Sequence, residues 1–440
     1  MRVRIILGLL FLTWTGAALA AEKTTAKETA PQAVATAGEL TLDKILSSAE
    51  EVNPGIKFSQ AMEKKAEASA SVVSSFDYPN LDLSASDSIG LSTPYYPTPF
   101  AYDGLLNSSY RRWAGADLVI RWNILDVSRW HDLDQHHEKI HSAEENIRVK
   151  RLEIYQQALQ LYLQASLLRG QREVWGDIAD KSKEILKVAS GFVHTGEYNE
   201  DKMLVIKIEK EEAETERDSF EEKYRKTLRK LALLTGLDDK GMECPLPSAL
   251  DEGILRVIQE GSSSPYLTFA QSEIKAARAT YDKSSAERLP KLFVMGSVGA
   301  LEGLPLAPQD DYSAWVGINL PLFDGYRIGS EEKERKAEIN EKEERLKDAQ
   351  LDVDELNTQY DEKINVAHIR IPLLEQESKD ANRSFVVARQ RFLSYRETVV
   401  IVRESLRDLS FIETQVNDSK IELLTALGLK SFLNGGTVPK

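Results

Sequence analysis

The pattern of hydrophobic and polar residues changes twice along the chain from a period of two, typical of a β-strand, to the longer period of an α-helix. The first change lies between residues 121 and 129, and the second lies between residues 318 and 327. The residues that correspond in the two stretches are Ile124 and Leu322, Asp126 and Asp324, and Arg129 and Arg327. The pattern therefore predicts a chain that is built from two similar halves.

A longer comparison supports this duplication. From Pro54 to Leu81, the second half can be laid over the first at a constant offset of 211 residues. Identical pairs at this offset are Pro54 and Pro265, Phe58 and Phe269, Gln60 and Gln271, Ala66 and Ala277, Ala68 and Ala279, Pro79 and Pro290, and Leu81 and Leu292. An internal duplication accounts for this register, and its period is far too long for a solenoid.

Each half contains two stretches in which hydrophobic and polar residues alternate. The four predicted strands cover residues of about 80–91, 113–125, 291–301 and 312–323. Their lengths are close to the roughly 9 to 11 residues that cross a membrane in a tilted strand. Aromatic residues near strand ends are typical of a membrane interface, and those in this chain are Tyr110, Trp113, Trp122, Tyr312 and Trp315.

We therefore expect the strands to form part of a membrane β-barrel, although alternation alone also fits the sheet of a soluble protein. Four strands cannot close a membrane barrel, for which about eight is the minimum. The barrel is accordingly expected to be shared between chains. Residues 92–112 are rich in proline and tyrosine and are expected to form a loop between the first two strands.

A long helical pattern follows the second strand of each half. In the first half, no glycine or proline interrupts it between Asp126 and Gly170. Apolar residues recur every seven positions, as in a coiled coil. The two series are Leu133, Ile140, Ile147, Ile154, Leu161, Leu168 and Trp175, and Ile339, Leu346, Val353, Tyr360, Ala367, Leu374, Ala381 and Ala388. A helix of about 65 residues reaches ~100 Å at the usual rise. We expect two long helical hairpins, over residues 127–236 and 326–428.

The sequence also predicts where these helices begin, turn and bend. The hairpins are expected to turn at residues 195–199 and 394–398. Pro372 lies inside a helical pattern and is expected to kink the helix or mark a junction. Near the start of the ordered chain, Thr41 is expected to cap a short helix, and Pro54 to open a second one.

These observations define the expected organisation of the chain. It consists of a signal peptide over 1–20, a flexible segment over 21–39, a first repeat over 40–236, a linker over 237–246, a second repeat over 247–430, and a tail over 431–440.

Composition narrows the range of functions. The formal net charge is −14, which argues against nucleic acid as a partner. Cys244 is the single cysteine and cannot form an internal disulfide. The sequence contains no recognisable nucleophile–base pair, phosphate-binding loop or cofactor motif. We predict a protein that is not an enzyme and needs no cofactor.

Four of the six histidines lie close together, at His131, His136, His137 and His141. His137 and His141 are four residues apart on one helical face, which is a spacing that zinc or copper ligands can use. The cluster is also explained by a polar patch on an exposed helix, and this is the preferred interpretation. No metal is therefore assigned.

The chain resembles the TolC-type outer-membrane efflux proteins over about Leu40 to Gly428. The most specific part of the resemblance is the stretch from Pro321 to Arg327, which is similar to the family's Pro-hydrophobic-Phe-Asp-Gly-x-Arg junction. The two helical hairpins and the four strands, arranged in two copies, complete it.

This resemblance implies a mostly α-helical fold with a membrane β-barrel portion. In such a homotrimer, twelve strands form one barrel in the outer membrane of a Gram-negative bacterium, in contact with its lipid. Twelve helices continue the barrel as a periplasmic tunnel. The duct is passive, and a periplasmic adaptor protein and an inner-membrane pump dock at the helix tips. Because the pump largely selects the substrate, small-molecule efflux and type I protein secretion both remain open.

The tips of the hairpins are the predicted docking sites for the adaptor. The family's tip pattern is Gly-x-x-Ser/Thr-x-x-Asp-x-Leu, and Gly196, Asn199 and Leu204 follow it approximately, with Lys202 at the aspartate position. The residues assigned to docking are Gly196, Glu197, Tyr198, Asn199, Ser394, Tyr395, Arg396 and Glu397.

The second tip departs further from the pattern and carries the predicted periplasmic gate. Ile401 replaces the aspartate, and Glu404 stands where a second acidic residue rings the entrance in well-known members. A ring of carboxylates attracts cations and repels itself, although Glu404 also fits an ordinary solvated helix face. Arg403 and Arg407 are expected to pair with Glu404 and hold the tip closed.

A function of a different class is also compatible with the helices. A structural coiled-coil protein could span the cell envelope without conducting. The four alternating strands favour the duct, because a spacer needs no barrel.

Overall fold

The computed structural model describes residues 40–92, 109–239, 241–259, 261–302 and 309–438. All of them belong to one compact unit, which spans Gly38–Lys440. The predicted signal peptide, the predicted flexible segment and most of the predicted loop between the first two strands lie outside these residues. No helix in the described ranges is both long enough and apolar enough to cross a membrane.

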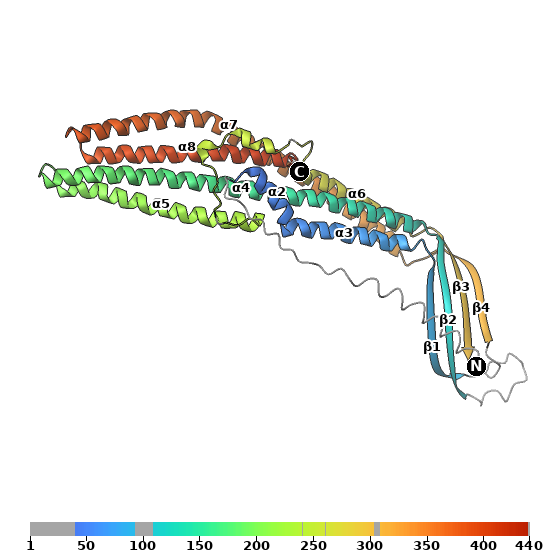
Figure 1. Ribbon diagram of the computed structural model, residues 1–440. Coiled ribbons are helices and arrows are strands. Elements are labelled where there is room, and N and C mark those ends of the chain that lie inside the picture. Colours follow the sequence, from blue (N-terminus) through green and yellow to red (C-terminus); the bar gives the residue numbers. More distant parts are fainter. Residues whose placement is uncertain (1–39, 93–108, 240, 260, 303–308, 439–440) are drawn as a thin grey trace, which may run out of the picture. The chain divides into compact units, whose positions relative to one another are not determined.

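The described elements repeat one order, a helix, two strands and a long helical hairpin (Figure 1). The first repeat consists of α2 Leu42–Val52, α3 Pro54–Ser75, β1 Asn80–Ser92, β2 Ser109–Leu125, α4 Val127–His194 and α5 Glu200–Thr235. Two 3-10 turns, η2 Pro247–Ala249 and η3 Glu252–Val257, connect it to the second repeat. The second repeat consists of α6 Pro265–Ala286, β3 Lys291–Glu302, β4 Gln309–Asn319, α7 Arg327–Leu393 and α8 Val399–Leu433.

Local chemistry sets most of the helix ends. Pro54 opens α3 as predicted, and the Asn53 side chain caps the helix by accepting a hydrogen bond from the Gly55 amide. Gly236 ends α5 in the left-handed conformation that glycine adopts without steric cost. Thr41 precedes α2, but its side chain makes no capping hydrogen bond, so that part of the prediction was wrong.

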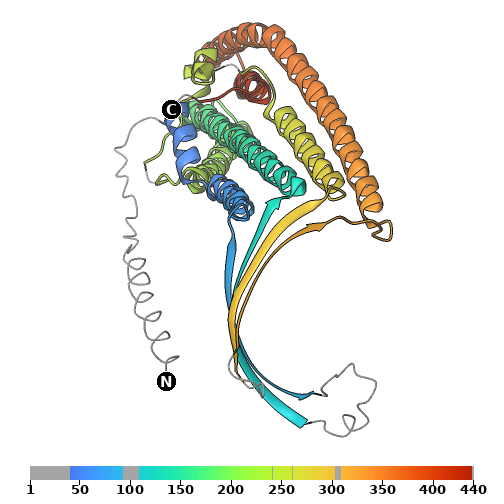
Figure 2. The same ribbon diagram turned by 90° about the vertical axis from the view of Figure 1, so that its right-hand side faces the viewer.

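The four strands form one antiparallel sheet in the order β1-β2-β3-β4, and they curve together (Figure 2). The β2–β3 register slips at Ile124, where an extra residue forms a bulge. β4 ends at Asn319, so the prediction of a strand to residue 323 was wrong. Pro321 has no amide to extend the ladder, and Gly325 and Tyr326 both adopt left-handed backbone angles.

The long helices pack as two hairpins, α4 with α5 and α7 with α8, and α8 also packs against α4. α7 continues through Pro372, so this proline does not mark a junction between two helices. Two contacts beside it hold α7 against α8: Leu374 is buried, and the Glu375 carboxylate lies 2.7 Å from the Lys420 ammonium. α8 runs to Leu433, beyond the predicted end of the hairpin.

Buried apolar side chains form two clusters along these helices. The first joins α2, α4, α5 and α8 with the linker, and includes Ile45, Leu159, Tyr162 and Phe432. The second lies nearer the hairpin turns and joins α4 and α5 with α7 and α8. α4 contributes to both clusters. It therefore connects the middle of the molecule to the tips.

A buried ionic contact joins the two repeats where strands become helices. Asp126 is only 7% exposed and caps α4 by accepting from the Ser128 amide. The Lys291 ammonium, at the start of β3, lies 3.2 Å from the Asp126 carboxylate and donates to the Ser128 hydroxyl. This contact fixes the first strand of the second repeat against the first long helix.

Replacing Lys291 with methionine should leave the buried Asp126 carboxylate without its cation. Because Lys291 is itself partly exposed, we expect a loss of about 1 to 3 kcal/mol in the free energy of unfolding. Thermal unfolding of the detergent-purified protein, followed by circular dichroism, measures it. Lys347→Met removes an exposed lysine and should leave the free energy of unfolding essentially unchanged. Equal effects of the two substitutions would contradict the conclusion that buried Asp126 depends on Lys291.

Candidate functional site

The turn between α4 and α5 forms the first hairpin tip. Gly196 has a φ of 74°, a left-handed angle that favours glycine. The amides of Glu197 and Tyr198 both donate to the Phe192 carbonyl, which closes the turn. Gly196 therefore allows the chain to reverse within a few residues, and it presents Tyr198 toward the neighbouring hairpin.

The turn between α7 and α8 has the same geometry with a different residue. Tyr395 takes the place of the glycine with a φ of 58°, and the Arg396 amide donates to the Arg391 carbonyl at 2.9 Å. A left-handed conformation costs a side-chain-bearing residue on the order of 1 to 2 kcal/mol. The Tyr395 ring packs 4.3 Å from the ring of Phe192, and this contact offsets part of the cost.

Four aromatic rings join the two tips: Phe192, Tyr198, Phe392 and Tyr395. The centroids of Phe192 and Phe392 are 5.5 Å apart, and Tyr198 meets Phe392 edge to face. The Tyr198 hydroxyl accepts a hydrogen bond of 2.8 Å from the Val399 amide, at the start of α8. The first hairpin thus caps the returning helix of the second, since the side chain of Thr398 makes no capping hydrogen bond.

A second connection lies farther along α5 and α8. The Arg407 guanidinium lies 2.7 Å from the Glu209 carboxylate and 2.6 Å from that of Glu212. The prediction that Arg407 pairs with Glu404 was therefore wrong. Arg407 points to α5 because Glu209 is buried there and needs a cation. Arg403 is half-buried, and its Nε has no hydrogen-bond acceptor in the described part of the chain.

Burial raises the pKa of the Glu209 carboxyl, and the nearby Arg407 opposes this increase. Among the other neighbours, Glu212 also raises the pKa of Glu209, and Arg403 lowers it. Burial thus favours the protonated form of Glu209, and a cation from the other hairpin, Arg407, favours the charged form. Protonation of Glu209 therefore bears directly on the contact between the hairpins.

Of the predicted gate residues, Glu404 lies on the exposed face of α8. Glu404 is exposed and makes no ion pair with another described residue, and Ile401 is exposed one turn before it. Lys202, at the other expected aspartate position, places its ammonium 5.2 Å from the centre of the Tyr198 ring. The structure thus separates Glu404 from Arg407, while it brings Lys202 into the aromatic cluster.

The histidine cluster lies near the start of α4. His136 Nδ1 is 2.7 Å from the Asp132 carbonyl, and His141 Nδ1 is 3.3 Å from the Glu144 carboxylate. Within the residues that the structure describes, no group of histidine, cysteine and carboxylate side chains is arranged to hold a metal ion. His131, His136 and His141 thus make local contacts on their own helix.

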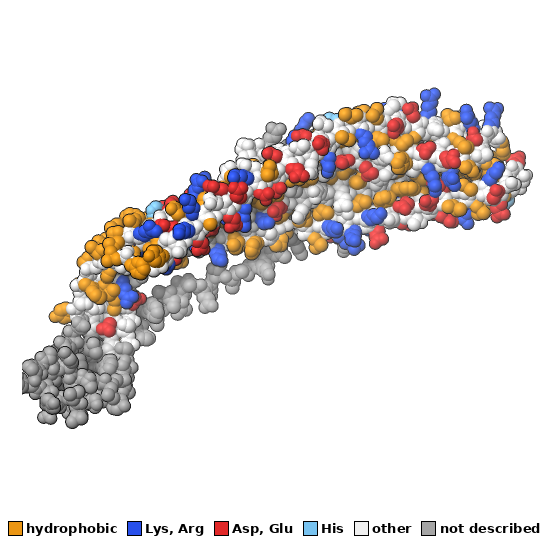
Figure 3. Space-filling view, turned by 180° about the vertical axis from the view of Figure 1, so that it is seen from behind, with side chains coloured by type: hydrophobic (Ala, Val, Ile, Leu, Met, Phe, Trp, Pro, Cys, Tyr) orange, Lys and Arg blue, Asp and Glu red, His pale blue; other side chains and the backbone are white. Residues whose placement is uncertain are grey.

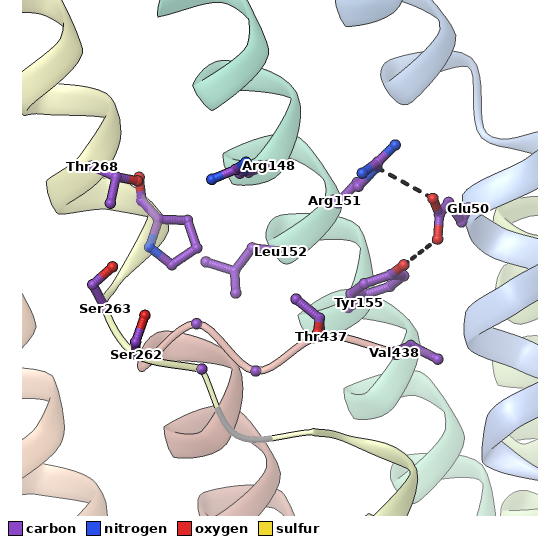
Figure 4. A pocket seen from close by; sticks show the side chains of 14 residues that line it. Glu50, Arg148, Arg151, Leu152, Tyr155, Ser262, Ser263, Thr268, Thr437 and Val438 are labelled. Atoms are coloured by element: carbon purple, nitrogen blue, oxygen red, sulfur yellow. Dashed lines mark hydrogen bonds and ion pairs between the residues drawn. The ribbon is translucent and has the colours of Figure 1, made fainter. Parts of the chain in front are cut away.

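A cavity of about 490 Å³ lies between α2, α4 and the segments before α6 and after α8 (Figure 4). Arg151 and Tyr155 both contact the Glu50 carboxylate from α4. Arg148 pairs with Glu145 at 3.0 Å. The charged side chains on the cavity wall are thus paired within the chain.

The order of elements, the curved sheet and the paired hairpins agree with one family of proteins. The sequence profile of that family, described as outer membrane efflux protein, matches residues 45–236 and 259–426. The chain belongs to the outer membrane efflux protein family. No curated protein sequence matches it.

Solved structures of outer membrane channels share the fold of this efflux protein at low sequence identity. VceC from Vibrio cholerae is 15% identical with a TM-score of 0.76, over 90% of this chain and 97% of VceC. The Campylobacter jejuni CmeC channel is 14% identical with a TM-score of 0.75, over 91% and 87%. The open MtrE channel of Neisseria gonorrhoeae is 13% identical with a TM-score of 0.72, over 90% and 89%.

Family membership confirms the location and the fold class that the sequence predicts. The efflux protein lies in the outer membrane of a Gram-negative bacterium, with its helical part in the periplasm. Its fold combines a β-barrel portion with an α-helical tunnel. The family is one of efflux channels, and the coarse function is therefore transport out of the cell.

Sequence reasoning named Tyr198, Tyr395 and Arg407 but missed four other residues that join the hairpins: Glu209, Glu212, Phe192 and Phe392. Glu209 and Glu212 are three residues apart on α5, among many other acidic residues. Nothing in their spacing distinguishes them from a solvated face. Phe192 and Phe392 lie two to three residues before the predicted turns, and this position was the available signal for them.

Replacing Tyr198 with phenylalanine should remove the acceptor for the Val399 amide while keeping the ring. Loss of one hydrogen bond costs about 1 kcal/mol, so amide exchange in the first turn of α8 should accelerate about fivefold. Hydrogen–deuterium exchange with mass spectrometry measures this change. Tyr266→Phe, on α6, should leave exchange at the tip unaltered. An unchanged rate in the Tyr198 variant would show that the contact does not hold the tip.

Glu209 should make stability depend on pH in a defined direction. Because its folded pKa is raised, its contribution is fully present below the unfolded value of about 4.3 and is lost as pH rises through the folded pKa. The side chain in Glu209→Gln cannot ionise, so the melting temperature of this variant should fall less steeply with pH just above the unfolded pKa. Glu377→Gln, at an exposed position on α7, should keep the wild-type slope. A wild-type slope in the Glu209 variant would refute the assignment.

Proposed function

We propose that this chain is the passive exit duct of a tripartite efflux or type I secretion system. Three copies form one outer-membrane barrel of twelve strands, continued by a periplasmic tunnel of twelve helices. A periplasmic adaptor protein and an inner-membrane pump act at the hairpin tips. The pump supplies the energy, and the duct provides the path to the outside.

The observation that carries this proposal is the contact between the two hairpin tips. Phe192, Tyr198, Phe392 and Tyr395 pack together at the end of the helices opposite the strands, and Arg407 joins α8 to α5. Such contacts keep the two hairpins of one chain together where the entrance of a duct would lie. A partner that binds the tips can open the entrance by separating them.

The exposed parts of both turns fit a docking role. The adaptor-docking residues are Gly196, Glu197, Tyr198, Asn199, Ser394, Tyr395, Arg396 and Glu397. Tyr395 is 58% exposed even though one side of its ring contacts Phe192. An exposed aromatic residue next to charged ones is typical of the centre of a protein interface.

Glu404 is the proposed selectivity residue of the entrance. Its side chain is exposed on α8, and Arg403 and Arg407 lie on the same helix within one turn. Three symmetry-related copies of Glu404 would form a carboxylate ring that attracts cations. Since Arg407 is occupied by Glu209 and Glu212, it leaves this carboxylate charge uncompensated.

Conductance in a planar lipid bilayer tests the duct. The purified full-length protein should form channels of uniform conductance, and an unboiled sample should migrate in a denaturing gel as a trimer. A non-conducting structural coiled-coil protein would give neither channels nor steps in the current. Absence of conductance from a correctly folded protein would refute the proposal.

The same bilayer tests the gate residue. Glu404→Ala should reduce the preference for cations over anions by a factor of about two or more, because the ring loses its charge. Glu377→Ala removes an exposed carboxylate of α7 and should leave the reversal potential unchanged. Unchanged selectivity in the Glu404 variant would exclude this residue from the entrance.

A further inference from the structure

The two faces of the described sheet differ in chemistry. Asn80, Arg121, Met295 and Trp315 are opposite one another on β1, β2, β3 and β4, so their side chains share one face. The other described residues of this face, here termed the polar face, are mostly polar or glycine: Asp82, Ser84, Gly115, Asp117, Val119, Asn123, Lys291, Phe293, Ser297, Gly299, Ser313, Gly317 and Asn319.

The opposite face of the sheet is apolar. Its described residues are Leu81, Leu83, Ala85, Ala116, Leu118, Ile120, Trp122, Leu292, Val294, Gly296, Val298, Tyr312, Ala314, Val316 and Ile318. Hydrophobic side chains also gather over the junction of β4 and α7 (Figure 3), where Leu320 and Leu322 are exposed. In a membrane barrel, lipid contacts the apolar face, and the polar face lines the interior.

The curvature of the sheet agrees with this assignment (Figure 2). Side chains on the concave side of a curved sheet converge, and those on the convex side spread apart. On the inner strand β2, Asp117 and Val119 of the polar face are half-buried. Leu118 and Ile120 of the apolar face are exposed. The polar face is therefore the concave one, which is the inner side of a closed barrel.

Apolar side chains interrupt the polar face at one place. Met295 is directly opposite Trp315, and Phe293 is diagonal to Trp315. Diagonal neighbours in a sheet are about 7 to 8 Å apart, which is within reach of aromatic side chains. The Phe293 ring lies over Gly317, where an added Cβ would come within 2.4 Å of it. Phe293, Met295 and Trp315 thus form one apolar patch, and Val119, diagonal to Met295, extends it.

The position of Trp315 differs from the expectation that it lies at the membrane interface. Trp315 and Tyr312 are three residues apart on β4 and therefore lie on opposite faces of the sheet. Tyr312 lies on the apolar face, as an interface residue does. Trp315 lies on the polar face and is 57% exposed. A large apolar ring exposed to water is unfavourable, so contact with lipid does not explain this residue.

Among the described charged residues of the polar face, Arg121 lies nearest to Met295. The two are directly opposite each other, and the exposed Arg121 side chain forms no ion pair with another described residue. Asp82 is one strand farther from Met295, and Asp117 is four residues from Arg121 along β2. Lys291 is four residues from Met295 along β3, and its ammonium already forms an ion pair. The guanidinium beside the patch is therefore available to an anion.

We propose that Arg121, Met295 and Trp315 contact the transported solute, and that the solute class they favour is an organic anion with an aromatic part. The indole ring and the thioether take the aromatic part, and the guanidinium takes a carboxylate, sulfonate or phosphate group. The inference rests on the proposed function, because only a duct brings a solute to this face. It goes further by naming the class of substrate.

The spacing of the three residues suits one small solute. Neighbouring strands are about 4.8 Å apart, so Arg121 lies about 5 Å from Met295 and about 10 Å from Trp315 along the row. All three side chains are on a solvated face, which keeps each contact weak. Conduction needs such contacts, because a solute must leave a site as readily as it enters it.

Block of single-channel current in a planar bilayer tests the inference on the full-length protein. Naphthalenesulfonate has both an aromatic part and an anionic group. It should block at lower concentration than methanesulfonate, which lacks the rings, or naphthylmethylammonium, which has the opposite charge. Trp315→Ala should raise the half-blocking concentration of naphthalenesulfonate about twofold to tenfold, because the ring contact is lost. Arg121→Gln should raise it about twofold to fivefold, as expected for an exposed ion pair.

Two further variants control for damage to the barrel. Tyr312→Ala removes an exposed aromatic side chain from the apolar face of the same strand and should leave the half-blocking concentration unaltered. Trp315→Phe keeps an aromatic ring and should retain most of the block. If Trp315→Ala does not assemble, Arg121→Gln tests the same row independently.

The remaining outcomes separate this inference from the proposed function. Channels that conduct, but whose block is the same in the Trp315 and Arg121 variants as in the parent, would overturn the inference and leave the duct intact. Equal or stronger block by naphthylmethylammonium would also overturn it, as would an equal effect of Tyr312→Ala. A correctly folded protein that forms no channels would overturn the proposed function and this inference together.

Discussion

The packing of α4 against helices from both repeats is the interaction on which the rest of the structure depends. In a folded protein, most of the stability of a helix comes from an apolar face buried against neighbours rather than from its own hydrogen bonds. Leu159 and Tyr162 are buried in the middle of the molecule, and Ile178 and Ala189 are buried nearer the tip. α4 therefore fixes the position of the second repeat at both ends of its length.

Within this arrangement, ionic contacts join the repeats both at the strand end and at the tip. At the strand end, Asp126 is buried and Lys291 is partly exposed, and the described structure pairs them with each other and with Ser128. At the tip, the Glu209 carboxylate is desolvated and depends on Arg407 of the other repeat. A buried charge that loses its partner is costly. Both ends are thus held in one arrangement unless a partner compensates for the loss.

The duplication makes the single chain incomplete. Among the described strands, β2 and β3 pair across the two repeats, and β1 and β4 each have a partner strand on one side.

The sequence by itself determined the repeat, the four strands, the two hairpins and the family. These features depend on periodicity and on residues such as Pro54, Gly196 and Asp324, whose effects on the backbone are local. Asp126 was identified as part of the junction, but its partner Lys291 was not, since the two are far apart in the chain.

Only the tertiary structure decided which side chains meet. Arg407 reaches Glu209 rather than the nearby Glu404, because desolvation of a carboxylate on another helix outweighs proximity in sequence. The end of β4 and the continuation of α7 through Pro372 were also decided by context: backbone pairing stops before Pro321, and packing on α8 holds the helix together. Local patterns specify elements, whereas burial, which depends on the whole fold, selects their partners.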